Sequence, residues 1–443
     1  MALPNILIVT TDQQHHAMMS CSGNRWLATP GMDRLARTGV RFVHACCSNP
    51  ACAPSRFSWW TGRMPSAIGV RSNEDVVREL PHEVHATALG HVMESAGYRS
   101  LFAGKVHLPG DLTPRSMGFE YLCDDERDRL AVEAAAFVRS HERRPWILAV
   151  NFINPHDICY LAIRELASTD NERRLIEHGA VECEEVDRTL AAAPPGGNEQ
   201  LATQYPPLPD NAAPQADEPE IIQELFAEWP FRGRARESWD EWKWRRHRWV
   251  YHRLTERVDA QIAVVLDALA SGGGAAGTVV IFTSDHGDQD GAHGLEHKLV
   301  PYDEAVRVPF IVSDPAGRSG MVDSSHIVQT GIDLMATCCD YAGVPAPQHC
   351  LGLSVRPVVT GGSVGGWRDG TLIETQIGDA YYTTEAKYVR YHHGAHSEQL
   401  YDKRTDPGET RNALADPQCA QIVGRCRNGM AEEIERHARV RVV

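Results

Sequence analysis

Four apolar segments of the chain run directly into polar residues that could do chemistry. Residues 5–11, 98–103, 146–152 and 278–283 have the pattern of buried strands. The residues that follow them are, in the same order, Asp12-Gln13, Gly104-Lys105-Val106-His107, Asn154-Pro155-His156-Asp157 and Ser284-Asp285-His286-Gly287. Ligands of doubly wound sheets bind at the carboxyl ends of the strands. One such strand end is weak evidence, but four together predict a single site at one edge of a sheet.

Asp12, Asp285 and His286 form a candidate metal-binding set, and Gln13 offers a further oxygen. Two carboxylates with amide or backbone oxygens suit a hard cation such as Ca²⁺ or Mg²⁺, while the imidazole also suits Mn²⁺. Taken singly, each aspartate could instead cap the turn after its strand. Their matching positions at strand ends favour the interpretation as ligands.

The segment Cys52-Ala53-Pro54-Ser55-Arg56 is predicted to open a helix, because proline suits a first helical position. A cysteine there lies at the positive end of the helix, which lowers the pKa of a thiol and favours attached anions. An ordinary reactive thiol is one interpretation, and a buried inert cysteine is another. The chain has 12 cysteines but no Cys-x-x-Cys pair, so neither a zinc site nor a disulfide framework is indicated.

The elements that must position these residues alternate between strands and helices. Further strands are expected at residues 41–45 and 307–312, and helices at residues 30–38, 83–96, 130–140, 253–270 and 332–341. This alternation predicts a mostly parallel sheet sandwiched by helices. Residues 160–245 show little periodicity, and we interpret them as an insertion or lid beside the site.

Beyond residue 360 the pattern changes to short strands separated by turn-length gaps. Strands are expected at residues 371–375, 380–384, 387–392 and 399–402, followed by a helix over residues 418–437. The fold class is therefore α/β. A catalytic domain is expected over residues 1–360, with a small antiparallel sheet and helix forming a subdomain over residues 361–443.

Charge and hydropathy exclude several classes of protein. The formal net charge of −15 argues against nucleic acid or an anionic membrane as the partner, because phosphate binding needs a broad basic face. A small anionic substrate is compatible, since local cations in a cleft can outweigh the global field. No segment reaches the roughly 18 apolar residues of a membrane helix, and the first residues lack the basic start of a signal peptide. A cytoplasmic protein is expected.

Residues 52–63, which read CAPSRFSWWTGR, resemble the signature of formylglycine-dependent sulfatases in the alkaline phosphatase superfamily. The segment has the Cys-x-Pro-Ser-Arg core and the downstream Thr-Gly. Other matches follow in family order: Pro4-Asn5, Gly104-Lys105-x-His107, Pro155-His156, Ser284-Asp285-His286-Gly287, His293-Gly294 with Lys298, Leu400-Tyr401-Asp402 and Asp406-Pro407-Gly408-Glu409. The resemblance covers nearly the whole chain except residues 160–245, and it implies an alkaline phosphatase-like fold.

The resemblance also implies an activity, a cofactor and a maturation partner. It implies hydrolysis of a small-molecule or saccharide sulfate ester, after a formylglycine-generating enzyme has oxidised Cys52 to an aldehyde. The implied catalytic residues are Cys52, Arg56, Lys105, His107, His156 and Lys298. The implied ligands of one divalent cation, Ca²⁺ in preference to Mn²⁺ or Mg²⁺, are Asp12, Gln13, Cys52, Asp285 and His286. The implied substrate-binding residues are His156, Lys298 and His293.

The implied mechanism uses both hydroxyls of the hydrated aldehyde at residue 52. One attacks sulfur and expels the alcohol, and the other, deprotonated by His107, lets the adduct collapse to release sulfate. A serine would leave a stable ester instead. Arg56 and Lys105 would hold the diol, while Lys298 and His156 would bind the sulfate and assist the leaving oxygen.

Three alternatives stay open at this point. Many family members have two adjacent aspartates after the first strand, where this chain has Gln13, and members with histidine at the position of His286 include some phosphonate and phosphate-ester hydrolases. A phosphonate monoester or phosphodiester hydrolase is therefore the second hypothesis, and an inactive binding protein is the third. The basic, aromatic residues 232–253 could bind an anionic sugar or a second copy, but we interpret them as a solvated helix with inward tryptophans.

Overall fold

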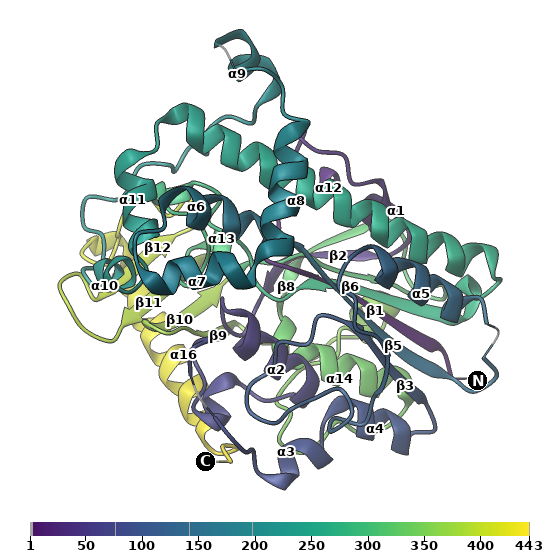
Figure 1. Cartoon of the computed structure of the whole chain (residues 1–443). Coiled ribbons are helices and arrows are strands. Elements are labelled where there is room, and N and C mark those ends of the chain that lie inside the picture. The colour runs from purple at the N-terminus through teal and green to yellow at the C-terminus, as the bar shows by residue number, and fades with distance from the viewer. Residues whose placement is uncertain (1–2, 76, 141, 197, 443) are drawn as a thin grey trace.

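A mixed sheet lies between two layers of helices, and a smaller antiparallel sheet packs beside it (Figure 1). This computed structural model describes residues 3–75, 77–140, 142–196 and 198–442. In order across the large sheet, the strands are β4 (Glu120–Cys123), β3 (Arg99–Gly104), β5 (Trp146–Pro155), β1 (Asn5–Asp12), β6 (Thr278–Ser284), β7 (Phe310–Ser313), β2 (Val40–Cys46) and β8 (Met321–Gln329). The predicted α/β architecture is confirmed.

The described strands of the large sheet run parallel to their neighbours except at β7. β7 is antiparallel to both β6 and β2, whereas β1 is parallel to both β5 and β6. The run Ile6-Leu7-Ile8-Val9 is fully buried, as expected for a central parallel strand that is covered on both faces. Because β5, β1 and β6 share one direction, their carboxyl ends meet at one edge of the sheet.

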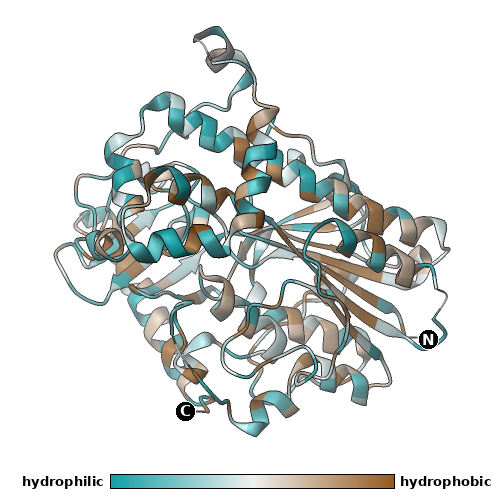
Figure 2. Ribbon diagram, viewed as in Figure 1, coloured by the Kyte–Doolittle hydropathy of each residue, from teal (hydrophilic) through white to brown (hydrophobic). Residues whose placement is uncertain are grey.

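Alternate side chains of β1 contribute to two separate hydrophobic cores. The helices on one face are α2 (Cys52–Thr61), α4 (Leu89–Ser95) and α14 (Thr330–Ala342), and those on the other are α1 (Pro30–Thr38), α5 (Asp128–Val138) and α12 (Glu241–Ser271). Ile6 and Ile8 pack on the first face, while Leu7 and Val9 pack on the second. Figure 2 shows the strands as mainly hydrophobic and the outer sides of the helices as hydrophilic.

Several helix boundaries differ from those predicted. Residues 83–96 form two helices, α3 (His82–Ala86) and α4, because the backbone between them is extended at Ala88, with φ −67° and ψ 154°. α12 begins at Glu241, twelve residues before the predicted start, and the Asp240 side chain accepts from the Lys243 backbone N–H as its N-cap. Strands β4 and β8 were not predicted.

Residues 160–245 are largely helical, which was not predicted. Their helices are α6 (Cys159–Leu166), α7 (Asp170–His178), α8 (Ala180–Ala191), α9 (Asn198–Gln204), α10 (Ile222–Glu228), α11 (Pro230–Ser238) and the start of α12. Most are short, so each shows too few turns for an apolar period to stand out. Glu172 closes a capping box with Thr169 and also accepts from the Phe231 backbone N–H, which ties α7 to α11.

The predicted antiparallel sheet and helix near the C-terminus are confirmed. The strands are β9 (Gly370–Glu374), β10 (Gly378–Thr383), β11 (Ala386–Tyr391) and β12 (Glu398–Asp402), and α16 (Ala420–Ala438) packs on them. Two short helices, α13 (Asp303–Val306) and α15 (Arg356–Thr360), precede this sheet. The 3-10 helices are η1 (Ser20–Ser22), η2 (Pro65–Ile68), η3 (His156–Ile158), η4 (Ala275–Gly277), η5 (Ala292–Gly294) and η6 (Pro417–Cys419). None of the described helices is long and apolar enough to cross a membrane.

A buried charge network joins β11 to α13 of the large domain. The Lys387 Nζ donates to Glu409 Oε2 at 2.7 Å and to Asp303 Oδ1 at 3.1 Å, and Lys403 also pairs with Asp303. Lys387 is 0% exposed, so these carboxylates replace the water that its ammonium group has lost. The network fixes the small sheet to α13, which lies between β6 and β7 of the large sheet in the chain order.

Replacing Lys387 with methionine is expected to lower the free energy of unfolding by about 3–5 kcal/mol, because it leaves the buried Glu409 without its ion-pair partner and removes one of the cations that contact Asp303. Urea denaturation measures the change. Arg390 lies on the same strand but is exposed, so Arg390→Met is the matched control, with an expected change within about 0.5 kcal/mol. Equal effects of the two substitutions would contradict a stabilising network.

Candidate functional site

Cys52 is the first residue of α2 and lies at the edge of the sheet where β1 and β6 end. The residue before it, Ala51, has an extended backbone and provides no side-chain cap. Pro54 is the third helical residue and not the first, which the helix tolerates because N–H groups of the first turn have no intrahelical acceptor. Cys52 is 1% exposed, so its thiol faces the interior. The prediction that this segment opens a helix is confirmed.

Asp12, Cys52, Asp285 and His286 present ligand atoms that all lie within 4.8 Å of one another. Asp12 ends β1 and Asp285 directly follows β6, and these two strands are parallel neighbours, so both carboxylates reach the same edge. All four residues are buried. Two carboxylates, an imidazole and a sulfur so arranged are able to hold a divalent metal ion.

Arg56 holds the two carboxylates of this cluster. Its Nε donates to Asp285 Oδ2 and its Nη2 to Asp12 Oδ2, each at 2.9 Å, while Nη1 donates to the Lys105 carbonyl at 3.2 Å. Burial lowers the pKa of Arg56, but the charges of Asp285 and Asp12 outweigh burial and raise it. Arg56 therefore stays charged and fixes the orientation of both carboxylates.

Two lysines add positive charge on either side of Cys52. The Lys105 Nζ lies 2.7 Å from Asp12 Oδ2, and the Lys298 Nζ lies 3.1 Å from Cys52 Sγ. His286 Nε2 lies 3.2 Å from the same sulfur. Burial and the charge of Asp12 raise the pKa of Cys52, but Lys298, Lys105 and His286 outweigh them and hold it well below its usual range. The site favours negative charge at residue 52.

Gln13 makes its side-chain contacts beside the cluster. Its amide oxygen accepts from Lys298 Nζ at 2.8 Å and from Cys159 Sγ at 3.0 Å, while its amide nitrogen donates to Asp288 Oδ2 at 2.6 Å. Its backbone has a φ of 66°, and the backbone N–H donates to Asp285 Oδ1. The amide oxygen of Gln13 accepts a hydrogen bond from Lys298, and the role of Gln13 as a metal ligand stays a prediction.

The structure brings His156 to the cluster. Its Nδ1 is buried and has no hydrogen-bond partner among the described residues. Burial and the positive charges of Lys105 and Lys298 lower the pKa of His156, although Asp12 opposes them. His156 is therefore a neutral imidazole with a free ring nitrogen beside two lysines.

His107 and His293 are placed differently. His107 lies on an exposed turn with a φ of 37°, and it forms no hydrogen bond or ion pair with the cluster in the described part of the chain. The His293 ring stacks on Tyr302 with centroids 3.6 Å apart, and its backbone N–H donates to the Asn211 carbonyl. The catalytic role of His107 and the substrate contact of His293 stay predictions.

Asp288 and Tyr251 both contact Gln13, and neither was predicted from the sequence as part of the site. Asp288 accepts from Gln13, and the Tyr251 hydroxyl donates to the Gln13 carbonyl. Asp288 follows the Ser-Asp-His-Gly segment directly, so its position was a usable signal. Tyr251 lies on the part of α12 that precedes the predicted helix start, so nothing in the local pattern connected it with β1.

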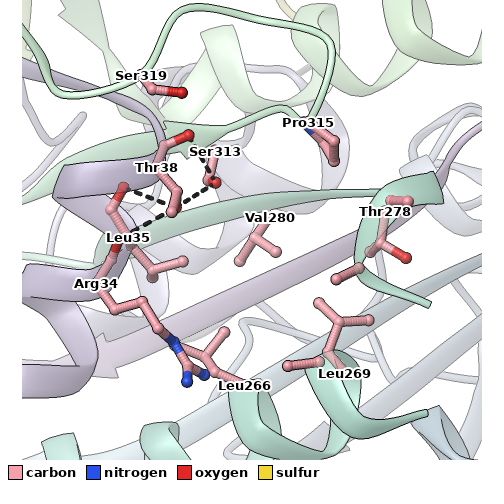
Figure 3. Close-up of a pocket in the computed structure, with 13 residues that line it drawn as sticks. Arg34, Leu35, Thr38, Leu266, Leu269, Thr278, Val280, Ser313, Pro315 and Ser319 are labelled. Carbon is pink, nitrogen blue, oxygen red and sulfur yellow. Dashed lines mark hydrogen bonds between the residues drawn. The ribbon is translucent and has the colours of Figure 1, made fainter. Parts of the chain in front are cut away.

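An apolar recess lies at the other end of the strands (Figure 3). It is lined by Leu35 of α1, Leu269 of α12 and Val280 of β6, together with Thr278. Thr278 is the first residue of β6, whereas Asp285 follows its last residue, so the recess is at the opposite edge of the sheet from the Cys52 cluster. It therefore takes no part in the chemistry at Cys52.

His247 of α12 is a buried histidine whose titration is expected to affect stability. Both ring nitrogens lack a hydrogen-bond partner among the described residues, and the ring packs against Trp239 and Trp244. Burial lowers the pKa of His247 from 6.5 to about 4. The unfolded chain therefore binds the proton first as the pH falls, and the free energy of unfolding should decrease between pH 6.5 and about 4.

His247→Phe is expected to remove the part of this pH dependence that comes from His247, because the phenyl ring cannot bind a proton in either state; other buried histidines, such as His252, keep their contribution. Urea denaturation at a series of pH values measures the slope. His178 of α7 is exposed, so His178→Gln is the control and should keep the wild-type slope. A slope unchanged in His247→Phe would contradict the buried neutral histidine.

The sheet and the buried cluster define an α/β enzyme site that is built for an anionic substrate. The family model described as Sulfatase matches residues 4–344, and the model described as N-sulphoglucosamine sulphohydrolase, C-terminal, matches residues 291–436. The chain belongs to the sulfatase family.

Relatives and solved structures match nearly the whole chain. The Delta 4,5-hexuronate-2-O-sulfatase of Bacteroides thetaiotaomicron is 28% identical over 98% of this chain and 89% of its own length. A solved 2-O GAG sulfatase has a TM-score of 0.83 at 27% identity, covering 99% of this chain and 93% of that chain. The phosphonate monoester hydrolase of Agrobacterium radiobacter shares the fold, with a TM-score of 0.75 at 20% identity, covering 98% of this chain and 96% of that chain.

Proposed function

We propose that this sulfatase hydrolyses the sulfate ester of a sugar, with residue 52 as its nucleophile after a formylglycine-generating enzyme has converted Cys52 to formylglycine. The observation that carries the proposal is the position of Cys52, in a Cys-x-Pro-Ser-Arg segment, within the cluster of Asp12, Asp285 and His286. The similarity to the Delta 4,5-hexuronate-2-O-sulfatase and to the 2-O GAG sulfatase supports a sugar as the carrier of the sulfate.

The donor set fits one divalent cation. Asp12 and Asp285 supply hard carboxylate oxygens, which favour Ca²⁺, and the imidazole of His286 leaves Mg²⁺ and Mn²⁺ as alternatives. Bound at this cluster, the cation would lower the pKa of the nucleophilic hydroxyl at residue 52 and polarise the sulfate. Arg56 orients the two carboxylates that hold it.

The chain's own residues bind the ester and move its protons. Lys298, 3.1 Å from the sulfur of residue 52, is proposed to bind the sulfate oxygens next to the nucleophile, and Lys105 to balance the charge of Asp12. His156, whose Nδ1 has no hydrogen-bond partner among the described residues, is proposed to protonate the leaving alcohol oxygen. This step requires His156 to take up a proton when the anionic sulfate binds and offsets the positive charges of Lys105 and Lys298, which lower the pKa of His156 in the free enzyme. His107 is proposed to take the proton from the second hydroxyl of residue 52, which requires its exposed side chain to turn inward.

Comparing kcat/KM for a sugar sulfate with kcat/KM for matched phosphonate monoesters and phosphodiesters tests the proposal. The sulfate ester is expected to react fastest. The fold shared with a phosphonate monoester hydrolase makes this comparison the decisive one. A faster phosphonate reaction would overturn the assignment, and hydrolysis of neither class would show a binding protein.

A further inference from the structure

Helix α11 brings the segment of residues 160–245 into contact with the catalytic loop. It packs on α6 and α10, and the Phe231 ring lies against the His297 ring with centroids 5.1 Å apart. His297 directly precedes Lys298, whose ammonium group contacts Cys52. The next residue of α11, Arg232, is therefore close to the loop that carries Lys298.

Arg232 is half-buried, and two of its three guanidinium nitrogens are buried without an acceptor. Its Nε and Nη1 are buried and have no hydrogen-bond partner among the described residues. The guanidinium lies over the ring of the neighbouring Phe231. Burial lowers the pKa of Arg232; Glu74 and Glu228 oppose this effect, but neither forms an ion pair with it. Buried N–H groups of a cation are costly to leave without an acceptor, and an anion would satisfy them.

Arg236, the next arginine on the inner side of α11, has its hydrogen bonds satisfied within the protein. The Arg236 Nη1 and Nη2 donate to the two carboxylate oxygens of Glu218, at 2.7 and 2.8 Å. The same helix therefore carries one arginine that is paired bidentately within the protein and one that is not. The unpaired one is next to the active site.

Arg232 lies near His297, as do the catalytic cations Lys298 and His156. Burial lowers the pKa of His297, and the positive charges of Arg232, Lys298 and His156 lower it further. The cations with the largest influence on Cys52 are instead Lys298, Lys105 and His286. Arg232 thus lies beside the site but farther from the nucleophile than Lys298.

We propose that Arg232 binds a second anionic group on the substrate, a carboxylate or a further sulfate on the sugar whose sulfate ester is cleaved. The inference rests on the proposed function and narrows its substrate class to anionic sugar sulfates. The planar guanidinium matches a carboxylate or a sulfate through two parallel hydrogen bonds. The residue comes from the segment of residues 160–245, outside the segments that carry the Cys52 cluster, so we expect it to affect specificity and to leave the reaction at sulfur unchanged.

The kinetic test compares Arg232→Gln with the wild type on two matched pairs of substrates. One pair is a 2-O-sulfated uronic acid and its methyl ester, and the other is a doubly and a singly sulfated hexosamine. In the pair that responds, the preference for the more anionic substrate is expected to fall roughly 30- to 5000-fold, the range for truncating one partner of a buried, hydrogen-bonded charge pair. The pair that responds identifies the group as a carboxylate or a sulfate.

Arg234→Gln is the matched control. Arg234 lies on the same helix, is exposed, and donates to the Leu166 carbonyl at 3.3 Å, so its loss should leave both preferences unchanged. Arg232→Lys keeps the positive charge but lacks the planar guanidinium, so it should lose part of the preference for the more anionic substrate. This variant provides a second test if Arg232→Gln does not fold. Unchanged preferences in both Arg232 variants, or an equal loss on the neutral and anionic members, would overturn the proposal.

Binding to Cys52→Ala protein separates this inference from the proposed function, because it needs no turnover. Calorimetry should show that the 2-O-sulfated uronic acid or the doubly sulfated hexosamine binds more tightly than its less anionic partner. Adding Arg232→Gln should remove that difference. A difference that persists would overturn the role of Arg232, whereas a wild type that binds these sugars but hydrolyses no sulfate ester would overturn only the proposed function.

Discussion

Cys52→Ser is expected to lower steady-state turnover by roughly 10⁴-fold or more while the fold is retained. The serine hydroxyl occupies the place of a sulfur that lies 3.1 Å from Lys298 Nζ and 3.2 Å from His286 Nε2, so it can still attack the ester once. It has no second hydroxyl on the same carbon, so the sulfated serine cannot release sulfate. A single stoichiometric release of alcohol and a sulfated peptide at residue 52 are the expected readouts.

Cys183→Ser is the control for this substitution. Cys183 is a half-buried free cysteine on α8, outside the cluster, and its replacement should leave turnover unchanged. Sustained turnover by Cys52→Ser at the wild-type rate would show that the second hydroxyl of a hydrated aldehyde is not needed.

Removing divalent cations, or replacing Asp285 with asparagine, is expected to lower kcat/KM by roughly 10²- to 10⁴-fold, which corresponds to several kcal/mol of lost charge stabilisation. Asparagine keeps the size of Asp285 and can still accept from Arg56 Nε, but it removes one of the two carboxylates of the cluster. Activity after chelation and re-addition of Ca²⁺, Mg²⁺ or Mn²⁺ measures the requirement. The variant should need a higher cation concentration than the wild type.

Asp267→Asn is the control for charge alone. Asp267 pairs with Arg34 at the surface and lies far along α12 from the catalytic cluster, so its loss should leave the cation requirement unchanged. Full activity of thoroughly chelated wild-type protein would contradict the metal-assisted site.

The central strands were predictable because their local sequence alone decides their environment. Ile6-Leu7-Ile8-Val9 is apolar at every position, which is the pattern of a strand whose two faces are both covered. The direction of β7 was not predictable, since antiparallel pairing with β6 and β2 depends on the tertiary path of the chain. β8 has the sequence MVDSSHIVQ and lies at the edge of the sheet. Its central residues are polar, so it lacks the apolar pattern by which the other strands were predicted.

The sequence predicted one site from the rule that ligands bind at the carboxyl ends of parallel strands. The structure places the strand-end residues together: Asp12, Lys105, Asp285 and His286. Lys298 does not follow a strand directly, so only the family resemblance pointed to it. Arg232 lies in residues 232–253, which were interpreted as a solvated helix. Trp244 and Trp249 pack inward as predicted, but the contacts of Arg232 depend on how α11 packs on the catalytic loop, which no local pattern records.

The mass of the peptide that contains residue 52 tests the central claim most directly. The measurement requires active protein from cells that also make the formylglycine-generating enzyme, with the fraction of modified residue 52 compared with specific activity across preparations. The proposal predicts an aldehyde or its hydrate at residue 52, with activity proportional to its fraction. Full sulfatase activity in protein whose Cys52 is entirely an unmodified thiol would contradict it.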